Sequence, residues 1–437
     1  MIRRSLREWE LIAYGNCERT IPEDHASSLV KVAKTSLFAG AGGEGVLEHR
    51  RKHLRARGVI GVIAAPGCQL EILPKIDAMG ENGVSDETLR RRLVHMLAVA
   101  RHIRIDAQNS TSLGWQRDTL LEILIRLFCR KMMEAVRQGI PRRYINHEDD
   151  LSALRGRLDM TRQFSTLAAH PQKLACRFEK LSPDIALNQV MKATIAKLVR
   201  FLTSADNQGS LRELSFAYAD ITDVPPNALR WEMITLDRTN KRWRELLSLA
   251  QLLLGNKYQT TSTGQSGGGH ALLFEMNTLF EECILRVLKR ALIGTDLKVT
   301  SQGGHKSCLF EDGTGRFRTR PDIIVKEGSN VVLIIDTKWK RMTPRIDDPK
   351  QGVSQSDVYQ LMAYSQLYQC NRVMLLYPHH QGLPSEPICK PYDIASPTGT
   401  DRLFVSTVDV AGGHSSVAAA LIATVHKSLE RSYEMTG

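Results

Sequence analysis

The sequence of 437 residues lacks any apolar run long enough to cross a bilayer. Its longest such runs, at 59–65 and 331–335, fall far short of the roughly 20 residues that a membrane helix needs. The N-terminus mixes Glu, Trp and Arg, whereas a secretion signal needs an apolar stretch of about 7–15 residues. These absences predict a soluble, cytoplasmic protein with no membrane partner.

Two common kinds of binding motif are also missing. The eight cysteines lie far apart, with no C-x-x-C pair and no histidine at zinc-finger spacing, so we expect reduced thiols that mostly serve packing. The pattern G-x-x-x-x-G-K-[ST] does not occur, so the chain has no P-loop, and another protein must supply any energy from a nucleotide. Residues 40–45 match G-x-G-x-x-G, but they follow a predicted helix instead of a strand, which argues against a dinucleotide site.

Positive charge is what the chain has in excess. With 59 Lys and Arg against 47 Asp and Glu, the net charge is +12, which favours a polyanionic partner. Hydrophobic residues at 42% and charged residues at 24% are typical of a globular protein and exclude a disordered or fibrous chain. The densest basic cluster, HRRKHLRAR at 49–57, is either a contact for DNA phosphate or an acidic partner, or a solvated charged face.

The length predicts two or three domains. We expect four parts: a β-rich N-terminal domain at 1–80, which is a candidate for partner binding, a mainly helical middle domain at 81–258, a linker or loop rich in Gly, Ser and Thr at 259–269, and an α/β domain at 270–437. In the first part, 59–65 and 69–76 are two strand-like runs separated by Pro66-Gly67-Cys68, which indicates a hairpin.

The last part begins with a predicted amphipathic helix at 271–293. At helical spacing Glu281 falls at the border of its apolar stripe, while Glu282 points nearly opposite it. Only Glu281 can therefore face a groove beside the core. The ordinary alternative is a solvated helix carboxylate.

A predicted β-hairpin brings two further carboxylates together. Two β-branched runs flank the turn at 327–330, and a turn centred on Ser329 places Asp322 across from Asp336. Alternation along the strand puts Lys338 on the same face as Asp336, whereas Thr337 should point the other way. Asp-x-Lys by itself is common, and the ordinary alternative is a strand end with solvated charges.

Paired carboxylates raise each other's pKa unless a cation joins them, and Mg²⁺ is the economical one because it accepts one or two carboxylates and keeps several waters. Lys338 could orient or help deprotonate an attacking water and offset charge in the transition state. The pattern also predicts a helix at 355–369 with Gln360 and Tyr364 on one face, followed by a buried strand at 372–377. Strand, crossover helix and strand predict a parallel pair at the sheet centre.

Basic residues surround these positions. The candidates for DNA binding are Arg318, Arg320, Lys340 and Arg341. The pair His379-His380 is better read as polar residues at a strand end than as a metal pair, because adjacent strand residues point to opposite faces.

The helix Glu, Pro-Asp, Asp-x-Lys and Gln-x-x-x-Tyr together resemble the restriction-endonuclease-like PD-(D/E)XK nuclease core. More narrowly, LFEE at 279–282, PDIIV at 321–325, LIIDTKWKR at 333–341, DVYQLMAYSQLY at 357–368 and LLYPHH at 375–380 are similar to the McrC family. Upstream, LEILPKI at 70–76, LRGRLDM at 154–160 and CRFEKLSPDIALNQVMKATI at 176–195 are similar to it as well. McrC proteins are the nuclease subunits of the modification-dependent McrBC restriction system.

The resemblance implies an α/β fold with a C-terminal nuclease core. It implies Asp322 and Asp336 as metal ligands, Lys338 as the catalytic lysine, Glu281 as a possible further ligand, and Gln360 with Tyr364 as supporting residues. It also implies two partners, double-stranded DNA and a hexameric AAA+ GTPase of the McrB type, which uses GTP and is stimulated through an N-terminal projection of the McrC protein.

Three hypotheses follow. The leading one is a Mg²⁺-dependent DNA endonuclease subunit of a McrBC-like system. A stand-alone repair or recombination nuclease with the same core is the second. The third is a non-catalytic adaptor that activates a GTPase and keeps only a nuclease-like fold.

Overall fold

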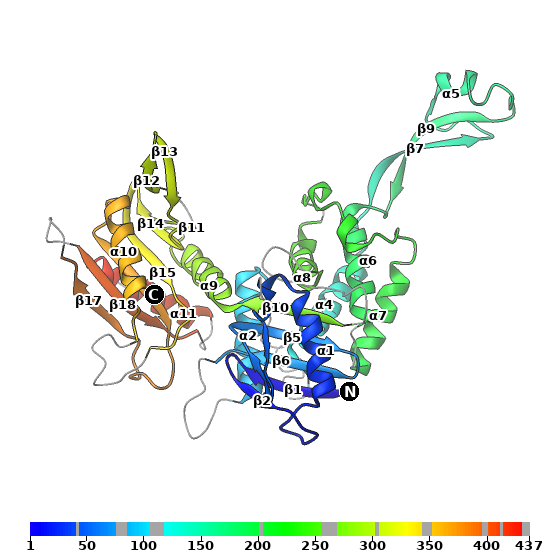
Figure 1. The fold of residues 1–437 in the computed structure, drawn as a ribbon. Helices are drawn as coiled ribbons and strands as arrows, with labels where there is room; N and C mark the ends of the chain where they lie inside the picture. The colour runs from blue at the N-terminus through cyan, green and yellow to red at the C-terminus, as the bar shows by residue number, and fades with distance from the viewer. Residues whose placement is uncertain are drawn as a thin grey trace. The chain divides into compact units, whose positions relative to one another are not determined.

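In the computed structural model the chain is a mixture of helices and β-sheets (Figure 1), which confirms the predicted α/β class. The structure describes residues 1–40, 43–75, 85–104, 118–200, 204–238, 240–254, 269–301, 306–342, 352–395, 401–410 and 414–430. They form two compact units, one of Met1–Leu121 with Gly255–Gly437 and the other of Glu122–Leu254.

The N-terminal part of the first unit is rich in strands, as predicted. Its elements are β1 (Ile2–Arg7), β2 (Leu11–Ala13), α1 (Glu23–Lys34), η1 (Leu37–Ala39), β3 (Leu47–His49), β4 (His53–Ala56), β5 (Val59–Ala65), β6 (Cys68–Leu73) and α2 (Asp86–Ala100). Strands β5 and β6 form the predicted hairpin, and Gly67 in its turn has φ +79°. The sheet has the order β1-β6-β5-β10, and α1 packs on β5 and β6 over a continuous apolar core.

The prediction of one helix over 271–293 is wrong at its start. Residues His270–Glu275 form strand β10, which pairs antiparallel with β5, and helix α9 (Met276–Ala291) begins only after it. A short, continuously apolar run does not distinguish a buried strand from a helix. The backbones approach closely here, since a Cβ on Gly61 would lie 1.9 Å from the carbonyl oxygen of Leu272.

Because β10 completes the N-terminal sheet, the expected boundary at 270 falls beside a strand that belongs to that sheet, and 1–121 groups with 255–437. The linker expected at 259–269 lies, except for Gly269, outside the described residues.

The second unit combines helices with a long β-ribbon. Its elements are α4 (Leu120–Arg137), β7 (Arg143–Leu151), β8 (Arg157–Leu158), α5 (Met160–Phe164), β9 (Leu174–Ser182), α6 (Ala186–Val199), α7 (Ala205–Ala217), η2 (Pro226–Ala228), η3 (Trp231–Met233), η4 (Lys241–Trp243) and α8 (Arg244–Leu254). Helix α6 contacts α7 and α8, and Trp243 and Tyr218 are fully buried. This unit is mainly helical, but the predicted middle domain of 81–258 also included α2, which belongs to the first unit, and the ribbon was not predicted.

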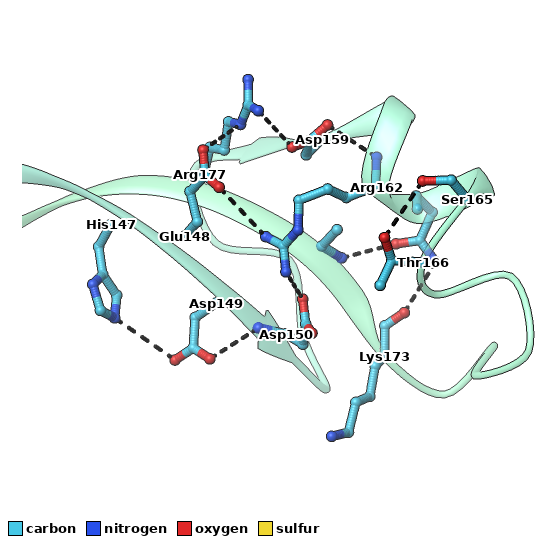
Figure 2. A network of polar contacts seen from close by, with 12 residues as sticks. His147, Glu148, Asp149, Asp150, Asp159, Arg162, Ser165, Thr166, Lys173 and Arg177 are labelled. Carbon is cyan, nitrogen blue, oxygen red and sulfur yellow. Dashed lines mark hydrogen bonds and ion pairs between the residues drawn. The ribbon is translucent and has the colours of Figure 1, made fainter.

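We call residues 143–182 the arm. Strands β7 and β9 pair antiparallel along their whole length and extend away from the helices of their own unit (Figure 1). Its far part is held by ion pairs (Figure 2): Arg177 lies 2.9 Å from Glu148 and 2.7 Å from Asp159, and Arg162 lies 2.5 Å from Asp150. Asp159 also accepts a hydrogen bond from the backbone N–H of Arg162 and so caps α5.

The C-terminal sheet of the first unit has the order β11-β14-β15-β16-β18-β17. The elements of this part of the chain are β11 (Leu297–Ser301), β12 (Ser307–Glu311), β13 (Thr314–Arg318), β14 (Ile323–Glu327), β15 (Asn330–Thr337), α10 (Gln355–Tyr368), β16 (Arg372–Pro378), β17 (Cys389–Asp393), β18 (Arg402–Val408) and α11 (His414–Ser428). Strands β12 and β13 pair with each other in a separate two-stranded sheet. The central pairs β15–β16 and β16–β18 are parallel, and α10 is the predicted crossover helix. Helix α10 contacts β15 and β16, while α9 contacts β11 and β15, and α11 contacts β18.

Candidate active site

The hairpin of β14 and β15 sets the positions of the two predicted carboxylates. Ile323 pairs with Ile335, so continuing this register by one residue places Asp322 opposite Asp336, as predicted. The turn is centred between Gly328 and Ser329, half a residue earlier than expected, and Gly328 has φ +59°. A β-bulge at Val332 restores the predicted register, because Val331 pairs with Lys326 and Leu333 pairs with Val325.

Asp336 and Lys338 form a buried ion pair. Nζ of Lys338 lies 2.7 Å from Oδ2 of Asp336, and only 1% of Asp336 is exposed. The two side chains share a face of the chain, as the alternation predicted. The backbone N–H of Lys338 donates to the carbonyl oxygen of Leu376 at 2.9 Å, which fixes this stretch against β16 just beyond the end of β15.

Asp322 is held by Thr337. Its Oδ2 accepts hydrogen bonds from the backbone N–H of Thr337 at 2.7 Å and from the hydroxyl at 2.9 Å. The prediction that Thr337 points away from the site is therefore wrong. Asp322 precedes β14, so its side chain is not bound by strand alternation and reaches the end of β15, where the N–H of Thr337 needs an acceptor.

The charges of this cluster shift its pKa values. Burial first, and then the neighbouring Asp322, raise the pKa of Asp336 to about 6 against the lowering effect of Lys338. Burial also raises the pKa of Asp322, although the hydrogen bonds from Thr337 oppose this. Burial lowers the pKa of Lys338, but the carboxylates outweigh it, Asp336 first, so the net pKa is raised and Lys338 is a cation at neutral pH.

Helix α10 supplies the second half of the cluster. Oε1 of Gln360 lies 3.4 Å from Nζ of Lys338, and Nε2 of Gln360 donates to the hydroxyl of Tyr364 at 2.7 Å. The two predicted supporting residues thus join the site as a chain of hydrogen bonds that ends on the lysine. Tyr364 is 5% exposed and belongs to the apolar core between α10 and the sheet.

Asp357 is a site residue that the sequence analysis missed. It lies in the first turn of α10, is 6% exposed, and places one oxygen 3.8 Å from Nζ of Lys338 and the other 2.8 Å from Nζ of Lys340. Its position three residues before Gln360 puts it on the same helix face, and this spacing could have identified it.

Trp339 ties the site to the N-terminal sheet. Its backbone N–H donates to Oδ1 of Asn277 at 3.0 Å, and its indole N–H donates to Oε2 of Glu8 at 3.2 Å. The ring packs against Phe280, with the ring centres 5.4 Å apart. Glu8 is 4% exposed and also accepts the backbone N–H of Lys75, yet burial raises its pKa to about 7.

Glu281, the possible further ligand, lies on helix α9. It is half-buried, and the neighbouring Glu282 lies 3.9 Å from Arg101, the residue that follows α2. Within the described part of the chain no three His, Cys, Asp or Glu side chains gather to hold a metal ion. The two carboxylates nevertheless fit Mg²⁺, which accepts one or two carboxylate ligands. The hydrogen bonds from Thr337 go to Oδ2 of Asp322, and the ammonium of Lys338 lies next to Oδ2 of Asp336, so Oδ1 of each carboxylate is the candidate ligand atom.

The predicted DNA-binding residues occupy different environments. Arg318 ends β13 and Arg320 precedes Asp322, both exposed, whereas Lys340 is paired with Asp357 and Arg341 is half-buried. His379 contacts the hydroxyl of Thr407 and His380 contacts the carbonyl oxygen of Met342, so these two are polar residues beyond a strand end, as expected.

The mixed sheet, its crossover helix and the two carboxylates beside a lysine define an α/β protein with a charged, partly buried site. A family model for the McrBC 5-methylcytosine restriction system component matches residues 54–378. The chain therefore belongs to this family of restriction-system components, as the sequence predicted.

Individual relatives agree with this assignment. A chain in the refined half-complex from the tetradecameric assembly of Thermococcus gammatolerans McrB AAA+ hexamers with bound McrC is 22% identical, with a TM-score of 0.69 over 96% of this chain and 99% of that one. A chain of the T. gammatolerans McrBC complex is 24% identical, with a TM-score of 0.53 over 66% of this chain and 88% of that one. These likenesses show the fold. The type IV methyl-directed restriction enzyme EcoKMcrBC of Escherichia coli K12 is 19% identical over 283 residues, or 63% of this chain and 80% of that protein.

Among the described residues, no helix is both long and apolar enough to span a membrane.

Proposed function

We propose that this chain is the Mg²⁺-dependent endonuclease subunit of a McrBC-like restriction system, with a PD-(D/E)XK core, acting on DNA in the cytoplasm. The observation that carries the proposal is the meeting of Asp322, Asp336 and Lys338 at the end of one hairpin. Family membership supports the restriction role, and the absence of a P-loop motif in the sequence is consistent with GTP being used by a partner.

Asp322 and Asp336 would hold Mg²⁺, with Glu281 as a possible further ligand, and the ion would supply a polarised phosphate and a bound water of lowered pKa. Thr337 orients Asp322 through its two hydrogen bonds. Lys338, a cation with a raised pKa, would offset negative charge on the attacked phosphate. Gln360 and Asp357 hold its ammonium from the side of α10.

Basic side chains near the hairpin would bind the DNA phosphates and hold the duplex at this site. Arg318 and Arg320 are exposed and precede Asp322 closely in the chain, and Lys340 and Arg341 follow Lys338 after Trp339. Contacts of this kind position a duplex without reading its sequence. Recognition of a modified base is therefore assigned to the partner.

The partner would be a hexameric AAA+ GTPase of the McrB type, because the structural relative is bound to such hexamers. The predicted contact region is 1–80. The arm is a second candidate, since a two-stranded ribbon with exposed apolar side chains has surface to bury. These side chains are Tyr144, Leu154, Met160, Phe164 and Leu181.

The proposal is tested by cleavage of a methylated plasmid with the chain, its partner GTPase, GTP and Mg²⁺. Asp336→Asn removes the charge that the metal needs and should abolish cleavage, while Lys338→Met should slow it by roughly 10²–10³-fold. Both variants should still stimulate GTP hydrolysis, which serves as the control for folding and assembly. EDTA should stop cleavage by the unaltered chain.

The outcomes separate the three hypotheses. Cleavage that needs neither GTP nor the GTPase would favour a stand-alone nuclease. Cleavage unchanged in Asp336→Asn would contradict the assigned site. If the unaltered chain stimulates the GTPase but never cuts under any of these conditions, it is an adaptor with a nuclease-like fold.

A further inference from the structure

The basic cluster at 49–57 lies on a small sheet of its own. Strand β4 pairs antiparallel with both β2 and β3, and Arg55 lies opposite Leu11 on one side and Glu48 on the other. Leu54 and Ala56 point into the core, so the alternate residue Arg55 is directed to the outer face. We call this outer surface the Trp9 face. It consists of Trp9, Arg50, Arg51, Lys52, Arg55 and Arg57.

The Trp9 face carries positive charge that its own acid does not balance. Glu48 is the single acidic residue between 47 and 57, against five Lys and Arg. Its carboxylate, 3% exposed, already has three guanidinium groups around it: Arg57 at 2.5 Å, Arg50 at 3.3 Å and Arg55 at 3.9 Å. Arg51 and Lys52 add two exposed cations in the turn between β3 and β4.

Trp9 organises two of these arginines. Its ring lies 5.7 Å from the guanidinium carbon of Arg55 and 5.5 Å from that of Arg57, so both groups rest on the indole. A Cβ on Gly58 would lie 3.1 Å from the ring, so the indole is packed closely on that side, although 41% of Trp9 is exposed. An arginine held on a ring loses less side-chain entropy when its N–H groups bind an anion.

The shape of the face also fits a ligand. Trp9, Leu11, Glu48 and the cations of the turn line an open hollow of about 650 Å³. Trp and Arg are also enriched at protein interfaces, so the feature that distinguishes this hollow is its unbalanced positive charge, with Glu48 as the one acidic residue in its lining. Guanidinium groups match phosphate oxygens in pairs, so a nucleic-acid backbone suits this face better than a protein does.

We propose that the Trp9 face is a second DNA contact, which binds the phosphate backbone outside the Asp322–Asp336 site. The inference rests on the proposed function in one respect: the proposed function makes DNA the polyanionic partner of this protein. It assigns to the basic cluster one of the two roles that the sequence left open. Such a contact fixes where the duplex lies and carries no sequence information.

The test is binding of a fluorescent 30-base-pair duplex by the full chain in EDTA, followed by anisotropy at several salt concentrations. Arg51→Ala/Lys52→Ala removes two exposed cations of the turn, neither of which belongs to the ion pairs around Glu48. Because each phosphate contact contributes about 0.9 to the slope of log K against log salt, the double variant should lower that slope by about 2 and weaken binding roughly tenfold or more at 0.1 M salt. Arg212→Ala/Lys241→Ala, an exposed pair in the other unit, removes equal charge and should leave the slope unchanged.

Trp9 gives an independent readout. Trp9→Phe keeps an aromatic surface under the arginines and should retain most of the affinity, whereas Trp9→Leu should weaken binding with the net charge unaltered. Circular dichroism melting of each variant checks the fold. Equal losses in Phe and Leu variants that melt like the unaltered chain would contradict the role of the ring.

The outcomes for the Trp9 face and for the nuclease are separate. Unchanged affinity and slope in Arg51→Ala/Lys52→Ala overturn the inference, and a loss of GTPase stimulation in that variant with unchanged DNA binding would assign the face to an acidic protein surface instead. Equal losses in the Arg212→Ala/Lys241→Ala control would also overturn it. A chain that binds DNA through this face and never cuts it contradicts the proposed function and supports the inference.

Discussion

Glu8 is a buried carboxylate whose ionisation costs the folded state free energy. Its pKa rises from an ordinary 4.5 to about 7 in the fold, chiefly because of burial. Below about pH 4.5 it is neutral in both the folded and the unfolded chain, so it costs nothing. Between about pH 4.5 and pH 7 the unfolded chain releases the proton while the folded chain keeps it, so stability falls across this range, and the loss is complete above about pH 7.

Glu8→Gln keeps an acceptor for Trp339 and Lys75 and removes this titration. We expect the variant to match the unaltered chain near pH 4.5 and to exceed it at pH 8 by on the order of 3 kcal/mol in free energy of unfolding. Urea unfolding at both pH values measures the difference. Glu10→Gln, an exposed neighbour, is the matched control, and a Glu8→Gln effect of equal size at both pH values would contradict the prediction.

The sequence predicted most of the site residue by residue but not all of their contacts. Asp336 and Lys338 follow from alternation, and Gln360 and Tyr364 follow from helical spacing, because both are periodic properties of one element. The hydrogen bond from Thr337 to Asp322 was not predicted, because Asp322 lies outside the strand and strand alternation does not determine where its side chain points. Asp357 was missed because its partners Lys338 and Lys340 are distant in sequence.

At the scale of elements, α5 in the arm depends on one carboxylate. Asp159 caps the helix and pairs with Arg177, so Asp159→Ala should destabilise α5 by about 1 kcal/mol. Hydrogen exchange should then become about fivefold faster at the amides of Arg162 and Gln163 and remain unchanged around Trp243. Asp149→Ala is the control, because Asp149 contacts His147 and the N–H of Asp150 instead (Figure 2). Equal acceleration in both variants would contradict this assignment.

The strands of the arm could not be predicted from the sequence. The residues of β7 and β9 are mostly exposed on both faces, so they carry no period-2 apolar pattern to recognise. Strand β10 was not predicted for the opposite reason: it is buried on both faces, so its sequence is continuously apolar and does not alternate. The hairpins β5–β6 and β14–β15 were predictable because turn residues and apolar strands agree there.

At the scale of the whole molecule, the exposure of the eight cysteines predicts how many thiols a reagent can reach. All are free: Cys17 and Cys308 are exposed, Cys389 is partly exposed, and the other five are buried. Burial raises the pKa of Cys129 and Cys283 to about 12, which further disfavours the reactive thiolate. We expect Ellman's reagent to titrate two thiols rapidly, a third slowly and all eight in denaturant without reductant. Fewer than eight would reveal a disulfide.

The β-bulge at Val332 limits which changes in the length of the β14–β15 turn the site can tolerate. Side chains on a strand alternate, so adding or removing one residue at the Gly328-Ser329 turn would turn Asp336 and Lys338 away from Asp322. Changes of loop length here should therefore come in even numbers, or be matched by gain or loss of the bulge. The parity of a short surface loop thus decides whether the carboxylates meet.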